Sequence, residues 1–345
     1  MRDLRNIRLL VQRELYGYFC SPIAYIFLVF LLGLMGFFTF GERLGSFYTR
    51  GVADLQLSFF AWHPWFFMVL VAAVGMRLWS EERDRGTLEL LSAMPVALWH
   101  AVTAKFLAGA VVIVAALLLT LPMVVTVNWL GAPDNGKIVC GYIGSLLLGC
   151  SFLALSSLAS ATTRNQVISF IVTLVAALLL ILCGFPAVIN VLMQSGAPLL
   201  LLDFVSSLSV YTHYEGLQRG VLDSRDLVYF AGLICFGLSA TLCVLRNATA
   251  VGLRPALRTA ATVACLALTF AAVVVIGNHY YVRRDLTRDQ RYTLSPGTRG
   301  ILQDLPRPVT MHLYYSRSQK GVPIEIKDFS RRVEDLLDEF ALAGD

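Results

Sequence analysis

Seven apolar segments dominate the sequence, and each is close to the roughly 20 residues that a helix needs to cross a bilayer. Backbone N–H and C=O groups find no partners in hydrocarbon, so segments of this kind cross as α-helices. The sequence therefore predicts an all-α polytopic membrane protein, with a six-span core and a seventh span beyond it. The predicted spans are 23–40, 62–79, 107–130, 138–161, 168–185, 227–245 and 259–277.

The charge distribution supports the same class. Hydrophobic residues make up 57% of the chain and charged residues 15%, against roughly 25% charged in soluble domains. Residues 283–345 hold 11 basic and 10 acidic residues, so the rest of the chain is poorer still in charge. The net charge of +5 comes from basic residues at span ends, and we expect no nucleic-acid partner.

The segment 80–105, between the second and third spans, is the most densely charged connection inside the core. Four basic and four acidic residues lie between Arg77 and Lys105, so this segment lies on one side of the membrane. It also has an apolar face of leucines, methionine and valine. A short amphipathic helix of this kind suits docking into a groove of a soluble partner, although an ordinary solvated loop would have a similar composition.

We expect that helix to begin at Gly86-Thr87, with Thr87 as its N-cap, and to end near Met94 because Pro95 follows. The ordered pattern Glu-Glu-x-x-x-Gly-Thr-x-Glu-Leu-Leu at 81–91 is followed by Pro95-Val96 and Lys105-Phe106. This pattern closely resembles the coupling segment of ABC-2-type transporter permeases. In that family the segment is a cytosolic helix that sits in a cleft of a separate ATP-hydrolysing subunit.

The resemblance implies a function and a set of partners. It implies an exporter permease that carries no catalytic site, cofactor or metal of its own, with ATP and magnesium bound by the ATPase partner. It also implies a second permease subunit, in a homodimer or a heterodimer, within membrane lipid. The ATPase-coupling residues that it implies are Glu81, Glu82, Arg85, Gly86, Thr87, Leu88, Glu89, Leu90 and Leu91.

Two further segments of the predicted core, 1–250, are not simple spans. Residues 2–19 combine an apolar helical face with arginines, which predicts an interfacial helix, with a targeting peptide as the alternative. In the resembling family this is the elbow helix. Residues 186–226 are apolar at first but interrupted by polar residues, proline and glycine, so we expect a re-entrant or surface-lying hairpin on the outer side.

Lysine and arginine placement predicts the orientation. With the N-terminus inside, the inner segments hold twelve basic residues, and the outer segments before residue 278 hold five. We therefore expect the N-terminus and 80–105 to be cytosolic in a multi-pass protein of the cytoplasmic (inner) membrane, and the C-terminal segment to be extracytoplasmic.

Residues 251–345 are predicted to form a separate unit, with its boundary near Ala250. The sequence DLTRDQRYTLSPGTRGIL at 285–302 leads into a first helix, and an alternating strand at 309–315 and a second helix at 325–343 follow. Together they resemble the opening of the auxiliary subunit of gliding-motility-type ABC systems. One strand and two helices bury too little for a complete α/β unit. Either the product is short or this is the front part of a longer fusion.

Other patterns carry little chemistry. The segment 131–137 has the glycine and lysine spacing of a phosphate-binding loop, but Ile138 replaces the magnesium ligand and no strand precedes it, so we expect a turn. The seven cysteines and five histidines show no ligand spacing. Small residues within 156–161 predict a close helix contact. An ATPase-driven mechanical or envelope-assembly component that moves no solute stays open as the alternative function.

Overall fold

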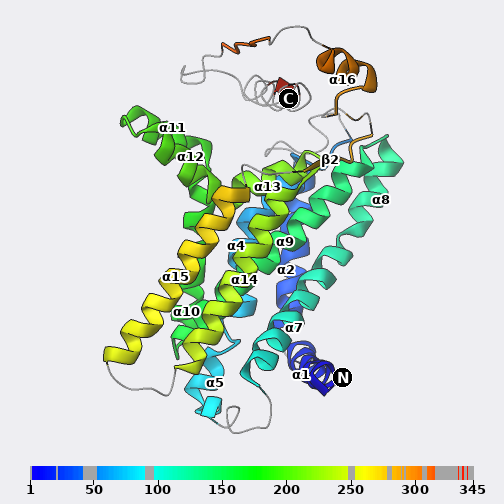
Figure 1. Ribbon diagram of the computed structural model, residues 1–345. Coiled ribbons are helices and arrows are strands. Elements are labelled where there is room, and N and C mark those ends of the chain that lie inside the picture. Colours follow the sequence, from blue (N-terminus) through cyan, green and yellow to red (C-terminus); the bar gives the residue numbers. More distant parts are fainter. Residues whose placement is uncertain are drawn as a thin grey trace.

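The computed structural model describes residues 2–20, 22–41, 53–89, 97–247, 253–277, 282–288, 290, 293–304, 309–314, 333, 336, 337 and 340. Long helices run side by side in one bundle, with α1 and α5 at one end and the short strands and α16 at the other (Figure 1). We call these the α1 end and the α16 end. The helices are α1 Arg2–Phe19, α2 Pro22–Phe40, the 3₁₀ helix η1 Phe60–Trp62, α4 His63–Gly75, α5 Ser80–Asp84, α7 Leu98–Leu119, α8 Leu121–Leu130, α9 Asn135–Thr162, α10 Gln166–Leu182, α11 Pro186–Gln194, α12 Leu199–Ser207, α13 Val210–Gln218, α14 Ser224–Arg246, α15 Leu253–Gly277 and α16 Pro296–Gln303.

Within the described residues, five helical stretches are long and apolar enough to cross a membrane. The pair α10 and α11 adds a sixth if it is counted as one span, although it bends by 65°. A shorter apolar helix, Tyr25–Phe40, lies within α2. Each of the seven predicted spans falls on one of these helices, and the predicted all-α polytopic class is confirmed. The five stretches are Phe60–Asp84, Leu98–Leu130, Asn135–Thr162, Ser224–Arg246 and Arg254–Gly277.

The third span begins earlier than its apolar run. The sequence predicts a charged segment up to residue 105, but α7 starts at Leu98 and includes His100 and Lys105, both buried. A helix can continue through a charged residue when that residue is paired, and Lys105 has several partners, which are described below. Residues 98–105 are therefore the first turns of α7.

The interrupted segment 186–226 forms three short helices, α11, α12 and α13, and the strand β1 Val221–Asp223. All lie at the α16 end, and α11 and α12 project away from the bundle axis there (Figure 1). Pro186 in the first turn of α11 and Gly196, with a φ of 77°, mark two of the breaks. The three helices have nine residues each, too few for a crossing by any one of them, and the re-entrant or surface-lying hairpin on the outer side stays a prediction.

Helix α9 is the centre of the core, because α4, α7, α10, α13 and α14 all pack against it. Close approach depends on small residues. A Cβ added to Gly237 of α14 would lie 2.8 Å from the Cβ and 2.9 Å from the backbone of Ala154 in α9. Ser156, Ser157 and Ser160 of α9 are buried and contact other helices, which confirms the predicted small-residue contact.

The chain beyond α15 returns to the bundle through a small antiparallel sheet. Strand β2 Arg283–Asp285 pairs with β1, with Leu222 opposite Arg284. The backbone N–H of Ser224 donates to the Val282 carbonyl at 3.0 Å, and that of Leu286 donates to the Gly220 carbonyl at 3.0 Å. We call residues 282–288 the strap. It fixes the start of the tail to the junction of α13 and α14.

The tail differs from its predicted pattern at one place. Residues 309–314 of the predicted strand 309–315 form neither strand nor helix. A strand needs a neighbour, and the sheet in the described part of the chain contains only β1 and β2. The predicted helix 325–343 lies largely outside the described residues, although 333, 336, 337 and 340 are helical.

The contact between α9 and α14 leads to a matched pair of expected outcomes. Gly237→Ala forces backbone atoms apart, so we expect it to destabilise the protein by about 1–3 kcal/mol. Gly33→Ala in α2 meets nothing within 4 Å and should instead stabilise the helix by about 0.5–1 kcal/mol. Thermal unfolding of both variants in detergent measures this. Equal melting temperatures would contradict the close contact.

Candidate functional site

The predicted coupling residues begin in α5 and the turn that follows it. The backbone N–H of Thr87 donates to the Glu82 carbonyl at 2.9 Å, that of Arg85 donates to the Glu81 carbonyl at 3.0 Å, and Gly86 has a φ of 68°. This is a Schellman-type helix ending, in which glycine adopts the left-handed conformation without a steric penalty because it has no Cβ. Gly86 therefore ends α5, a helix that the sequence did not predict.

Thr87 is the residue that the sequence predicts as a helix N-cap. In the structure its hydroxyl donates to the Glu82 carbonyl at 3.3 Å, and Leu88 and Glu89 after it are helical. Leu88 packs against the hydrophobic core of the bundle. Leu90 and Leu91, the other two predicted anchors, lie outside the described residues.

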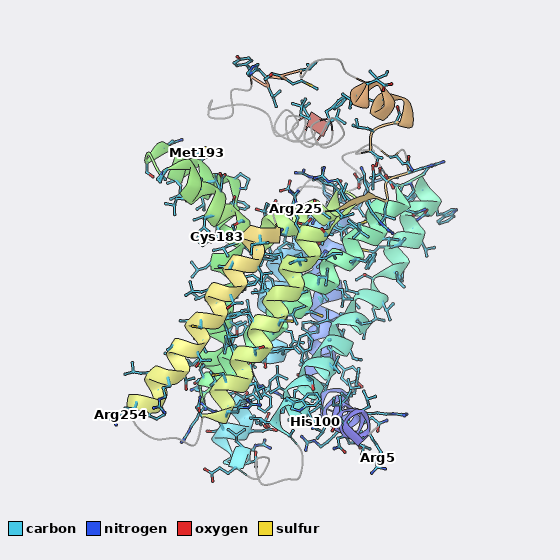
Figure 2. All side chains as sticks on the ribbon, in the orientation of Figure 1. Arg5, His100, Cys183, Met193, Arg225 and Arg254 are labelled. Atoms are coloured by element: carbon cyan, nitrogen blue, oxygen red, sulfur yellow. The ribbon has the colours of Figure 1, made fainter. Side chains whose placement is uncertain are left out.

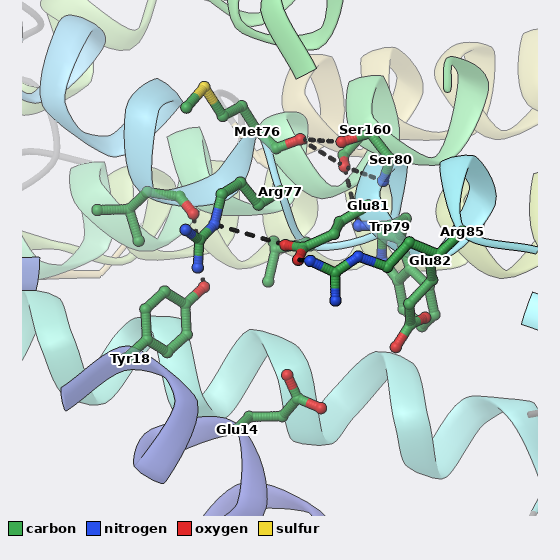
Figure 3. A network of polar contacts seen from close by, with 12 residues as sticks. Glu14, Tyr18, Met76, Arg77, Trp79, Ser80, Glu81, Glu82, Arg85 and Ser160 are labelled. Atoms are coloured by element: carbon green, nitrogen blue, oxygen red, sulfur yellow. Dashed lines mark hydrogen bonds and ion pairs between the residues drawn. The ribbon is translucent and has the colours of Figure 1, made fainter. Parts of the chain in front are cut away.

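Helix α9 holds the entry to α5. Helix α4 ends at Gly75, and Ser160 of α9 bonds the backbone of the break: its Oγ accepts from the N–H groups of Trp79 and Ser80, both at 2.9 Å, and donates to the Met76 carbonyl at 2.9 Å (Figure 3). The Trp79 indole N–H donates to Ser157 Oγ at 3.0 Å. These bonds satisfy buried backbone groups that the helix break leaves free.

Lys105 of α7 lies beside the same turn and is only 6% exposed. Its Nζ donates to the Leu78 carbonyl at 2.7 Å and lies 2.9 Å from Glu82 Oε1 and 3.6 Å from Glu14 Oε2. It also lies 4.9 Å from the centre of the Trp79 ring, within the range of a cation–π contact. One ammonium group thus joins α1, the α4–α5 connection, α5 and α7.

Glu81 is paired within the chain as well. Its carboxylate lies 2.7 Å from Arg85 Nη2 and 3.7 Å from Arg77 Nε (Figure 3). The sequence expects Glu81 and Glu82 to face basic residues of a partner, and it does not predict these internal pairs. Sequence reasoning included Lys105 in the pattern that follows 81–91 but gave it no partner, and it missed Glu14. The available signal was a single lysine in an otherwise apolar helix, which requires a carboxylate nearby.

Comparison with known proteins identifies the bundle. Residues 23–286 match the family described as ABC-2 family transporter protein. The chain belongs to the ABC-2 transporter family. In this family the chain is the transmembrane component, and the match covers α5 with the turn after it, α9 and the strap as far as Leu286.

The tail matches a second family. Residues 288–345 match a family described as a domain of unknown function (DUF7088). No curated protein and no solved structure matches the chain. The ABC-2 match ends at 286, beyond the boundary expected near Ala250, and the strap ties this region to the bundle. The boundary at 250 and the auxiliary-subunit resemblance stay predictions. Within the described residues, no three His, Cys, Asp or Glu side chains are grouped to hold a metal ion.

The Lys105 contacts predict a specific pattern of stability. Lys105→Met leaves the carboxylates of Glu82 and Glu14 without their buried cation, so we expect a loss of roughly 3–5 kcal/mol. Adding Glu82→Gln to that variant should recover part of the loss. Arg85→Gln, which removes an exposed cation from Glu81, should cost under about 1 kcal/mol. Unfolding in detergent compares the three, and equal effects for Lys105 and Arg85 would contradict this assignment.

Proposed function

We propose that this chain is the membrane subunit of an ABC-2 exporter, and that its α5 turn couples ATP hydrolysis on a separate subunit to transport. The supporting observation is the dual attachment of that turn. One side is bonded to α9 through Ser157 and Ser160, and the other is joined to α1 and α7 through Lys105. A movement imposed on the turn therefore reaches the centre of the bundle and the interfacial helix together.

The proposed orientation places the protein in the cytoplasmic (inner) membrane, with its α1 end on the cytosolic side. Arg5, His100 and Arg254, from segments predicted to be inside, lie at the α1 end, whereas Met193 and Arg225 lie at the other (Figure 2). The excess of basic residues on the inner segments supports this orientation. The coupling turn then faces the compartment that contains ATP.

In this proposal the residues of the turn divide into two roles. Glu81, Glu82 and Arg85 hold the turn in position through their ion pairs, and Gly86 and Thr87 set its direction. Leu90 and Leu91 are the leucines that enter the ATPase cleft, whereas Leu88 packs against the bundle's own core. ATP and magnesium belong to the ATPase, and a second permease subunit, the same chain or a related one, completes the translocation path.

Substitution of Leu90 and Leu91, the proposed docking residues, tests the coupling directly. An apolar anchor lost from a buried interface costs roughly 1–3 kcal/mol, so Leu90→Asp with Leu91→Asp should weaken ATPase docking at least about tenfold. Val191→Asp, at an exposed position of α11 at the opposite end, is the matched control and should have no effect. Co-purification of the cognate ATPase and its cargo-stimulated hydrolysis measure both. Wild-type behaviour of the leucine variant would remove the main support for this function.

A second candidate function, a mechanical or assembly role in the cell envelope, is favoured by the strap. A tail that only hung from α15 would need no further attachment. Instead, the Arg288 N–H donates to the Asp134 carboxylate at 3.3 Å, and Arg283 Nη2 lies 3.6 Å from Asp223 Oδ2. Movement at this end of the bundle would be passed to the tail, whether or not a solute crosses.

Strap stability can be tested by hydrogen exchange. Arg283 is largely buried against Asp223, so Arg283→Gln should loosen the sheet and speed amide exchange at 282–288 by about tenfold, equivalent to about 1.4 kcal/mol. Arg284→Gln alters the neighbouring exposed side chain and should change exchange little. If both variants exchange alike, the ion pair does not hold the strap. If the Arg283 variant also keeps full transport in vesicles, movement of the tail is separate from export.

A further inference from the structure

A cavity of about 510 Å³ lies between α1 and the α5 turn. Its lining comes from the last turns of α1, from the α4–α5 connection, from the turn at 85–87 and from α7, so it opens at the α1 end of the bundle. The proposed docking of the ATPase does not use it. Four cations line it, Arg13, Arg77, Arg85 and Lys105, together with three carboxylates.

Each carboxylate of the cavity has at least one cation beside it. Glu14 lies 2.6 Å from Arg13 and 3.6 Å from Lys105, Glu81 is paired with Arg77 and Arg85, and Glu82 lies 2.9 Å from Lys105. The lining therefore has a net charge of +1 at neutral pH. Each guanidinium has five N–H donors, and one carboxylate cannot use all of them. Glu82 Oε2 has no hydrogen-bond partner among the described residues, but the three guanidinium groups keep more donors than the carboxylates use, and with the positive net charge they favour an anion.

Tyr18 adds a neutral hydroxyl to this set. Burial raises the pKa of its phenol well above the ordinary value, an effect that Glu14 strengthens and Arg77 opposes. The phenol therefore remains protonated and adds no negative charge against an anionic ligand.

We propose that this cavity binds the phosphate of an anionic phospholipid headgroup from the leaflet next to α1. Guanidinium groups bind phosphate oxygens with paired N–H donors, and basic pockets beside spans hold lipid headgroups. The volume suits a phosphodiester with its glycerol, since small-molecule pockets measure about 300–1,000 Å³ and a free phosphate ion would leave most of the space empty.

The surroundings favour lipid as the source of the phosphate. Helix α1 has the arginines and apolar face of an interfacial helix. Exposed apolar side chains continue from it onto α2, including Leu9, Phe19, Tyr25 and Ile26. Acyl chains therefore have apolar surface beside the headgroup site. A bound phosphate would connect Arg13 of α1 to Arg77 and Arg85 at the coupling turn, and so make that attachment depend on lipid.

Native mass spectrometry of the full chain in detergent tests the proposal, with phosphatidylglycerol as the probe. We expect one tight site for phosphatidylglycerol and at least tenfold weaker binding of phosphatidylcholine, whose headgroup carries no net charge. Arg13→Gln and Arg77→Gln should each raise the phosphatidylglycerol Kd about tenfold. Each leaves its carboxylate another cation, and melting temperatures check that both variants stay folded. Arg5→Gln and Arg8→Gln, in α1 but outside the cavity lining, are the matched controls and should leave the Kd unchanged.

Several results would overturn the proposal. Equal weakening by the Arg5 and Arg8 controls would show only general attraction between a basic helix and an anionic lipid. Displacement of the lipid by millimolar inorganic phosphate would make the cavity a site for the free ion. Absence of a discrete phosphatidylglycerol site, with the cavity arginines protected from modification only when the ATPase is bound, would assign the cavity to that protein. None of these readouts depends on transport, so the proposed exporter function could fail while lipid binding holds.

Discussion

The buried ammonium group of Lys105 is the interaction on which the α1 end depends. A cation this far from water is stable only if carboxylates and carbonyls replace its hydration, and Glu82, Glu14 and the Leu78 carbonyl do so. Those partners come from parts of the chain that are far apart in sequence. Their positions are therefore linked: α1 cannot leave α7, and the α5 turn cannot tilt, without exposing an unpaired buried charge.

Helix α9 provides the second fixed point, and it does so with small polar side chains. Ser157 and Ser160 reach the broken backbone between α4 and α5, where a larger residue would push the helices apart. Neutral hydroxyl groups satisfy those N–H donors without placing a charge in the bundle. Such an arrangement resists deformation inside the helices, so an applied displacement moves them as units.

The sequence predicts the spans well because the length of an apolar run fixes whether a helix can cross, independently of its neighbours. Gly86 differs, because the sequence predicts it at the start of a helix, whereas its left-handed conformation ends α5. Lys105 shows the limit. Its charge suggested the edge of a polar segment, yet partners from α1 and α5 let α7 continue through it. The strap was also missed because it depends on distant partners: β1 and β2 have three residues each and form a sheet only by pairing with each other.

The two candidate functions share one mechanical element. Helix α9 has 28 residues, a length of about 42 Å at 1.5 Å per residue. Ser160 near its last turn bonds the entry to α5, and Asp134, which caps its first turn, accepts the Arg288 N–H of the strap. A tilt of this helix imposed at the α5 turn would displace its other end in proportion to that length. Coupling to the tail would then follow from the rigidity of a single helix, and export and envelope mechanics would differ only in what the moving end acts on.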